Sequence, residues 1–202
     1  MQTTKIFLIL PLVFAIIAIT ACESKDEGKI DDSSLEISPD SEAQVIEKDI
    51  DGIVFKFCLL NEQGKPATIF KKGENFVFSF SFKNNLTKNI SVPTQFINDD
   101  FYRVYRNNNI DMGKAWTGIW CNFRYEKMII ELSPYEYKQL HCPWLWSENF
   151  WPDYPLCKAD DGMNPLSQGK YSTTLHFDFI YTIDGEQKNI KDIIFQINFN
   201  IQ

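Results

Sequence analysis

The chain has 202 residues, enough for one domain of ordinary size but not for several. Its formal net charge is −7, and residues 23–49 alone carry ten acids against three lysines. Residues 50–202 carry 17 acids against 16 basic residues, so this part is nearly neutral. This balance gives no electrostatic basis for binding nucleic acid or for docking the domain directly on an anionic membrane surface.

The first 21 residues have the organisation of a secretory signal peptide. Lys5 precedes an apolar stretch from Ile6 to Ile19, which is shorter than the roughly 20 residues that span a bilayer. The sequence Ile19-Thr20-Ala21-Cys22 then resembles the lipobox of bacterial lipoproteins, in which the cysteine is diacylated and becomes the first mature residue. We therefore expect removal of residues 1–21 and a lipid on Cys22. The alternative is an ordinary signal peptide followed by a chance cysteine.

Residues 22–49 are predicted to be a lipidated, acidic tether. A segment rich in Asp, Glu and Ser with few aromatics buries too little surface to fold, so we expect it to be disordered. Lys25, Asp26 and Glu27 follow the lipid cysteine closely and resemble the surface-export signal of Bacteroidota lipoproteins. The resemblance implies an outer-membrane lipoprotein exposed at the cell surface, held to the membrane by its lipid. The alternative is a solvated spacer with no export role.

Residues 50–202 are predicted to form one antiparallel β-sandwich. Residues 76–82, 174–181 and 192–201 alternate large apolar with mostly polar side chains, and residues 54–60 form a further apolar run of strand length. A period of two places one set of side chains on a buried face. Turn signals such as Asp184-Gly185 separate these runs, and no window shows a helical stripe. The pattern favours an all-β sandwich.

Five short motifs lie in a characteristic order along this part of the chain. They are Gly64-Lys65-Pro66, Lys72-Gly73-Glu74-Asn75, Leu132-Ser133-Pro134, His141-Cys142-Pro143-Trp144 and Gly169-Lys170-Tyr171. With this order, residues 53–182 resemble the bacterial intracellular proteinase inhibitor domain. The resemblance implies an immunoglobulin-like sandwich and, as a possible activity, inhibition of a secreted or host protease. Tyr135 stands where the family usually has a glycine, and residues 147–168 form a long insertion.

Four cysteines remain once Cys22 is assigned to the lipid. An oxidising compartment permits disulfides among Cys58, Cys121, Cys142 and Cys157, with three possible pairings. Cys142 and Cys157 flank a tryptophan-rich stretch, and a bridge between them would contribute about 3 kcal/mol. Cys58 lies inside an apolar run, where a buried free thiol is the alternative. No close cysteine pair indicates a zinc site, so no metal is expected.

All five tryptophans lie between residues 116 and 151. Trp146 and Trp151 flank the polar residues Glu148 and Asn149, and these four are the predicted ligand-binding residues. Aromatic faces beside carboxylates and amides suit a sugar, and Trp is also favoured at protein interfaces. Trp144 follows a strand-like run and is expected in the core. The alternative is that all of these rings only cover the open end of the sandwich.

Catalytic patterns are sparse. The chain has two histidines, His141 and His176, and lacks a Gly-x-Ser-x-Gly, a phosphate-binding glycine loop and a His-Glu-x-x-His motif. We therefore predict no catalytic residue and no cofactor. The predicted function is a cell-surface binding or adhesion module for a glycan or a protein, with protease inhibition as the alternative and an enzyme third.

Overall fold

The computed structural model describes residues 34–119, 129–147, 150–158 and 163–202. The chain divides into two compact units, 1–30 and 31–202, and every described residue lies in the second. The regular secondary structure of the described part is all β, apart from a 3₁₀ helix, η1, at Thr94–Phe96. Within these ranges no helix is long and apolar enough to cross a membrane. The predicted all-β class is confirmed.

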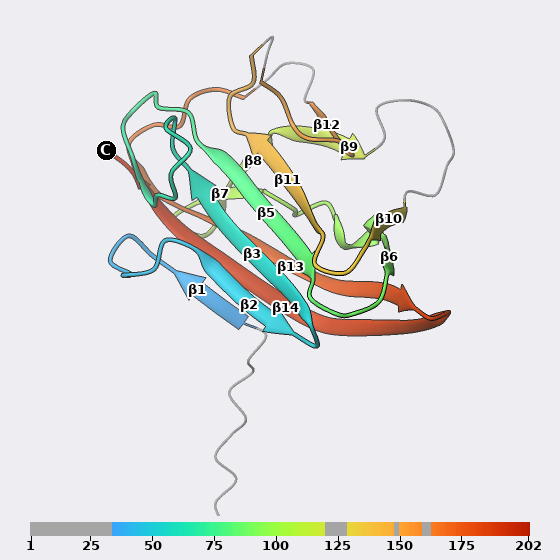
Figure 1. Ribbon diagram of the computed structural model, residues 1–202. Helices are drawn as coiled ribbons and strands as arrows, with labels where there is room; N and C mark the ends of the chain where they lie inside the picture. The colour runs from blue at the N-terminus through green and yellow to red at the C-terminus, as the bar shows by residue number, and fades with distance from the viewer. Residues whose placement is uncertain (1–33, 120–128, 148–149, 159–162) are drawn as a thin grey trace, which may run out of the picture. The chain divides into compact units, whose positions relative to one another are not determined.

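The strands form two large sheets and a small third one (Figure 1). The larger sheet has the order β1–β14–β13–β6–β10, with β4 also on β14, β7 on β13 and β8 on β7. Its strands are β1 Ser34–Ile37, β4 Ile69–Phe70, β6 Ile90–Pro93, β7 Val104–Arg106, β8 Ile110–Gly113, β10 Ile129–Leu132, β13 Gly169–Ile183 and β14 Glu186–Ile201. The second sheet, β11–β5–β3–β2, contains β2 Ile46–Ile50, β3 Ile53–Leu60, β5 Val77–Asn84 and β11 Tyr137–Pro143. The third pairs β9 Trp116–Ile119 with β12 Leu156–Lys158.

The connections are those of a β-sandwich. The chain crosses repeatedly between the sheets: β3, β5 and β11 lie side by side in one, while β6, β13 and β14 lie side by side in the other. Tyr171, near the start of β13, donates its hydroxyl to the Ser167 carbonyl at 2.7 Å. A tyrosine bonded to the backbone a few residues upstream is a hallmark of immunoglobulin-like domains.

Phenylalanine rings fill the space between the two large sheets. The predicted inward residues of β5, Phe78, Phe80 and Phe82, have no exposed surface. Phe55 of β3 lies across from β13, with its ring centroid 4.9 Å from that of Phe179 and the rings nearly perpendicular at 86°. Edge-to-face pairs of this kind are favourable beyond the area they bury. The alternation read from the sequence therefore identifies the core face of these strands.

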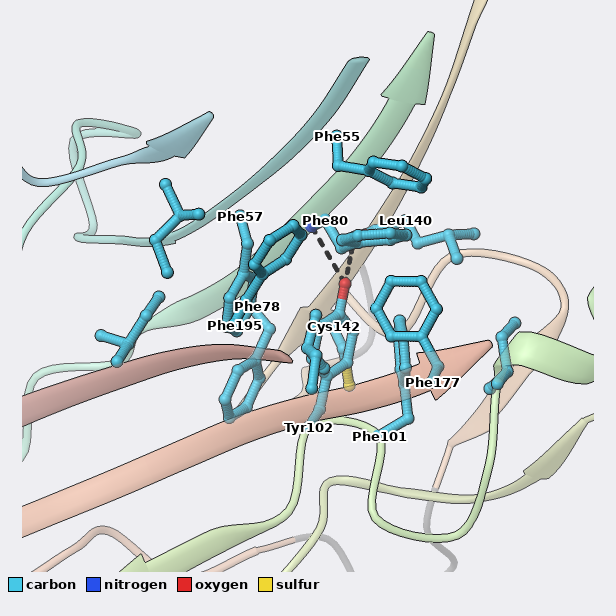
Figure 2. Close-up of a cluster of buried hydrophobic side chains, with 14 of the residues drawn as sticks. Phe55, Phe57, Phe78, Phe80, Phe101, Tyr102, Leu140, Cys142, Phe177 and Phe195 are labelled. Carbon is cyan, nitrogen blue, oxygen red and sulfur yellow. Dashed lines mark hydrogen bonds between the residues drawn. The ribbon is translucent and has the colours of Figure 1, made fainter. Parts of the chain in front are cut away.

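Tyr102 lies in the loop after η1, and its buried side chain holds this loop against the core. Its hydroxyl accepts a hydrogen bond from the Phe80 amide at 3.0 Å and donates one to the Leu140 carbonyl at 2.8 Å (Figure 2). Phe80 and Leu140 are paired residues of β5 and β11, so the hydroxyl lies between two neighbouring strands. Burial raises the pKa of Tyr102 well above its ordinary value. These two hydrogen bonds hold the loop after η1 against the four-stranded sheet.

The predicted boundary between tether and domain, at residue 50, is too late. β1 and most of β2 lie within the expected tether. Ile37 and Ile46 are buried in the core, and Lys56 pairs with Glu47 at 2.8 Å. Apolar residues spaced through an acidic segment therefore supply enough burial and pairing to order it. Residues 22–33, which include the predicted lipid cysteine and the predicted export residues, lie outside the described part.

Candidate functional site

Two long connections meet beside the end of β11. β9 and β12 belong to different connections of the sandwich, yet they pair antiparallel, with Gly118 opposite Cys157 (Figure 1). We call residues 144–158 the aromatic segment. Two of its residues, Glu148 and Asn149, lie outside the described part, so the structure is silent on these two predicted ligand-binding positions.

Side chains and backbone groups hold the aromatic segment to the sandwich. Asp153 accepts a hydrogen bond from the His141 amide at 2.8 Å, and its own amide donates to the His141 carbonyl at 2.7 Å. The side chain of Asn75 bonds both backbone groups of Leu145, at 2.6 and 2.8 Å. Asp153 therefore occupies the outer edge of β11 at His141, where an unpaired strand edge would otherwise be open.

The tryptophans of this region separate into two environments. Trp144 is only 1% exposed, stacks on Phe76 with ring centroids 5.8 Å apart, and donates its indole N–H to the Asn164 carbonyl at 2.9 Å. Trp116 is also buried, and its indole donates to the Phe101 carbonyl at 2.6 Å. Trp144 is thus a core residue, as expected from its position after a strand-like run.

Other rings of the aromatic segment lie at the surface. Phe150, Trp151 and Tyr154 are 42%, 51% and 60% exposed. Trp146 is half-buried, and the Lys158 ammonium lies 4.4 Å from its ring centroid and 5.8 Å from that of Trp151. Of the predicted ligand residues, Trp151 therefore offers the more open ring. The prediction omitted Tyr154 and Lys158, and their spacing in the sequence carries no periodic signal that would have selected them.

A groove of about 340 Å³ borders the aromatic segment. It lies on the outer face of the β11–β5–β3–β2 sheet, and its lining includes Leu60, Glu62, Val77, His141 and Phe150. The Nε2 atom of His141 is buried and has no hydrogen-bond partner among the described residues, while its Nδ1 atom lies 3.4 Å from the Asp153 carboxylate. Sequence reasoning did not find this groove, because its walls come from three separate parts of the chain.

The same face carries a row of Cys58, Ser79 and His141 on neighbouring strands. A cysteine and a histidine can form a nucleophile and base, but the nucleophile must be a thiolate. Burial raises the pKa of the Cys58 thiol, which favours the unreactive protonated form. Within the described ranges no group of three or more His, Cys, Asp or Glu side chains is placed to hold a metal ion.

The proposed Cys142–Cys157 disulfide is wrong. Cys142 is a free thiol with no exposed surface, and burial raises its pKa. Cys157 is disulfide-bonded, whereas Cys58, like Cys142, is a free thiol. The physical reason is strand alternation: Cys142 shares the inward face of β11 with Leu140, whereas Cys157 lies on the small β9–β12 sheet.

Comparisons with known proteins leave the family open. No protein-family model and no curated protein matches the sequence. Among solved structures, the CooA pilin subunit from enterotoxigenic Escherichia coli aligns over 72% of this chain and 98% of its own, at 11% identity and a TM-score of 0.30. A likeness at this level supports no conclusion about family or function.

Proposed function

We propose that this protein is a cell-surface lipoprotein whose immunoglobulin-like domain is a non-catalytic binding or adhesion module for a glycan or a protein. One observation carries the proposal. Phe150, Trp151 and Tyr154 lie within five consecutive residues, and each is between 42% and 60% exposed to solvent. Large aromatic side chains are the commonest energetic anchors of binding surfaces. A cluster of them left exposed favours recognition over packing.

The way the aromatic segment is held supports the same function. The Asp153–His141 and Asn75–Leu145 bonds fix its backbone at separated points. A surface that is ordered before its ligand arrives loses less conformational entropy on binding. The domain can therefore present these rings without a folding step.

The binding proposal is tested with the full-length protein in detergent. We expect Trp151→Ala to abolish or strongly weaken binding on a glycan array or in a pull-down with candidate protein ligands, with the melting temperature unchanged. Tyr137→Ala is the matched control, because Tyr137 is 63% exposed on β11 away from the segment. A ligand that binds the parent and the Trp151→Ala variant equally would remove the aromatic segment from the proposal.

The proposed lipid anchor and the proposed surface export are tested separately. Cys22→Ala should abolish labelling by palmitate, since the thiol that receives the lipid is gone. Alanine at Lys25, Asp26 and Glu27 should leave the lipid in place but protect the protein from protease added to whole cells. Undiminished palmitate labelling of the first variant would contradict the lipid anchor. Unchanged cleavage of the second variant by the added protease would contradict the export signal.

Protease inhibition is the second candidate. The observation in its favour is that the crossing pattern of the sandwich and the Tyr171 bond belong to the same fold class as the inhibitor domain that the motifs resemble. Under this candidate, stoichiometric amounts of the protein would inhibit at least one of trypsin, chymotrypsin, elastase, subtilisin or papain. Full activity of all five enzymes would leave the binding module as the better proposal.

A further inference from the structure

The groove beside the aromatic segment has an apolar wall. Leu60 of β3 and Val77 of β5 are paired residues on the outer face of the sheet, and the half-exposed ring of Phe150 lies against the same space. The volume of about 340 Å³ is near the lower end of the range for small-ligand sites, roughly 300–1,000 Å³. The groove is therefore large enough for a small ring and too small for a folded element of a partner.

Polar groups with unused hydrogen-bonding capacity border that wall. Glu62 accepts the Asn75 amide through Oε1 at 3.2 Å, and no described residue bonds its Oε2. Asn61 accepts two backbone amides through Oδ1, both at 3.0 Å, and its Nδ2 has no described acceptor. His141 also lines the groove, and its buried Nε2 atom has no hydrogen-bond partner in the described part of the chain. The groove thus combines an apolar wall with separate donor and acceptor groups.

We propose that this groove binds one sugar ring of a glycan. A sugar ring has an apolar face of C–H groups and a rim of hydroxyls that both donate and accept, which matches the wall and border. A purely apolar side chain of a protein partner would desolvate the Glu62 carboxylate and leave its Oε2 atom unpaired, which is unfavourable. The inference rests on the proposed function and narrows its ligand from a glycan or protein to a glycan.

Phe150 connects the groove to the rest of the candidate site. It lines the groove and is followed directly by Trp151, whose ring is half-exposed. Phe150 is therefore shared by the groove and the exposed rings of the aromatic segment. The groove supplies directional hydrogen bonds, and the aromatic segment supplies stacking surface.

The two histidines of the chain make a direct test possible. His141 lines the groove, whereas His176 lies on β13, is 59% exposed at its side chain and faces Asp192 at 3.6 Å. Imidazole NMR spectra of the full chain in detergent would be recorded during titration with glucose, galactose, mannose, N-acetylglucosamine or N-acetylneuraminic acid. We expect at least one sugar to shift the His141 signals saturably and to leave those of His176 unchanged. Equal shifts of both histidines, or none with any sugar, would overturn the inference.

Two tryptophan substitutions on one sheet face provide matched variants. Val77→Trp fills the groove, and Val54→Trp adds the same bulk near the other end of that face, where Val54 pairs with Lys83. We expect the first to weaken sugar binding about tenfold or more and the second to leave it unchanged. If Val77→Trp fails to fold, Glu62→Gln replaces it, because the amide oxygen can still accept the Asn75 bond while the charge is lost.

The outcomes separate this inference from the proposed function. Sugar binding that survives Val77→Trp or Glu62→Gln but is lost in Trp151→Ala would overturn the groove and keep the binding module. Binding of a protein ligand with no response to any sugar would also overturn the groove while the module stands. Failure of the parent to bind any glycan or protein would overturn both.

Discussion

The sandwich core and the aromatic segment use the same kinds of side chain in opposite ways. In the core, rings such as Phe82 come from strands whose backbone groups pair in ladders, and they have no exposed surface. In the aromatic segment, Trp144 is buried while Trp151, seven residues later, is half-exposed. The segment's backbone is held at isolated points such as Asp153. Hydrophobicity alone therefore does not decide whether a ring is buried; the place of the residue in the fold does.

The largest expected loss of stability follows from truncating the centre of the core. Phe55 is fully buried and contacts the rings of Phe80, Phe177, Phe179 and Phe195. We expect Phe55→Ala to lower the free energy of unfolding by about 3–5 kcal/mol, because it removes buried area and leaves a cavity. Urea unfolding measures this, with Tyr137→Ala as an exposed control expected within about 0.5 kcal/mol. Similar losses in both variants would mean that the core is not where the structure places it.

Within the aromatic segment, a buried ring, Trp144, can be compared directly with a half-exposed one, Trp151. Trp144→Ala should cost about 3–5 kcal/mol, because a buried ring and its bond to Asn164 are lost. Trp151→Ala should change stability by only about 0.5 kcal/mol, since half of the ring is already in water. Thermal unfolding of the two variants in parallel checks this. Equal destabilisation would show that both rings belong to the core and would weaken the binding proposal.

A smaller loss is expected where the core meets the loop after η1. Tyr102→Phe keeps the buried ring but leaves the Phe80 amide and the Leu140 carbonyl without their shared partner. Buried groups left unpaired cost about 1–3 kcal/mol. A Tyr102→Phe variant as stable as the parent in urea would show that these two backbone groups find other partners.

The same residue predicts a pH dependence. Because burial raises the Tyr102 pKa in the folded state, its stabilising contribution is present below the unfolded pKa of about 10 and is lost as pH rises beyond it. The stability difference between parent and Tyr102→Phe should therefore narrow between pH 8 and pH 11. Urea midpoints at both values measure it, and a difference that widens at high pH would contradict the sign.

The sequence was informative wherever one face of a strand had to be buried. The alternation at residues 76–82 identified the core side of β5, and the Asp184-Gly185 signal identified a two-residue turn in which both residues have positive φ. The pairing of β9 with β12 and the insertion of the Tyr102 hydroxyl were not predictable. Each depends on contacts between segments that no local period connects. The wrong Cys142–Cys157 pairing has the same origin, because nearness in the sequence does not reveal that the Cys142 side chain points into the core.

The attachment of the aromatic segment can be weakened without altering the core. Asp153→Ala removes the acceptor for the His141 amide, and with its carboxylate 44% exposed we expect a cost of about 1 kcal/mol. Asp153→Asn retains an acceptor oxygen and should recover most of this stability. Hydrogen exchange should show faster exchange in residues 150–158 of the alanine variant and unchanged protection in β5. Uniformly faster exchange would mean that segment and core unfold together.

The smallest expected effect is a gain. Tyr135 has φ of 67°, follows Pro134, and lies in a turn closed by a bond from the Glu136 amide to the Ser133 carbonyl at 3.1 Å. Proline followed by a residue with positive φ is typical of a type II turn, in which glycine is preferred at the second of these positions. This accounts for the glycine expected there from the motif.

Tyr135→Gly should therefore stabilise the protein by about 0.5 kcal/mol. Relief of left-handed strain, about 1–2 kcal/mol, outweighs the greater flexibility of glycine in the unfolded chain and the loss of a distant Lys83 contact at 6.0 Å. Gly185→Ala is the matched opposite: its φ is 81° and no atom crowds the added methyl group, so only backbone strain should lower its stability. Chemical unfolding would show a higher midpoint for the first variant and a lower one for the second. Shifts in the same direction would mean that φ does not control the stability of these turns.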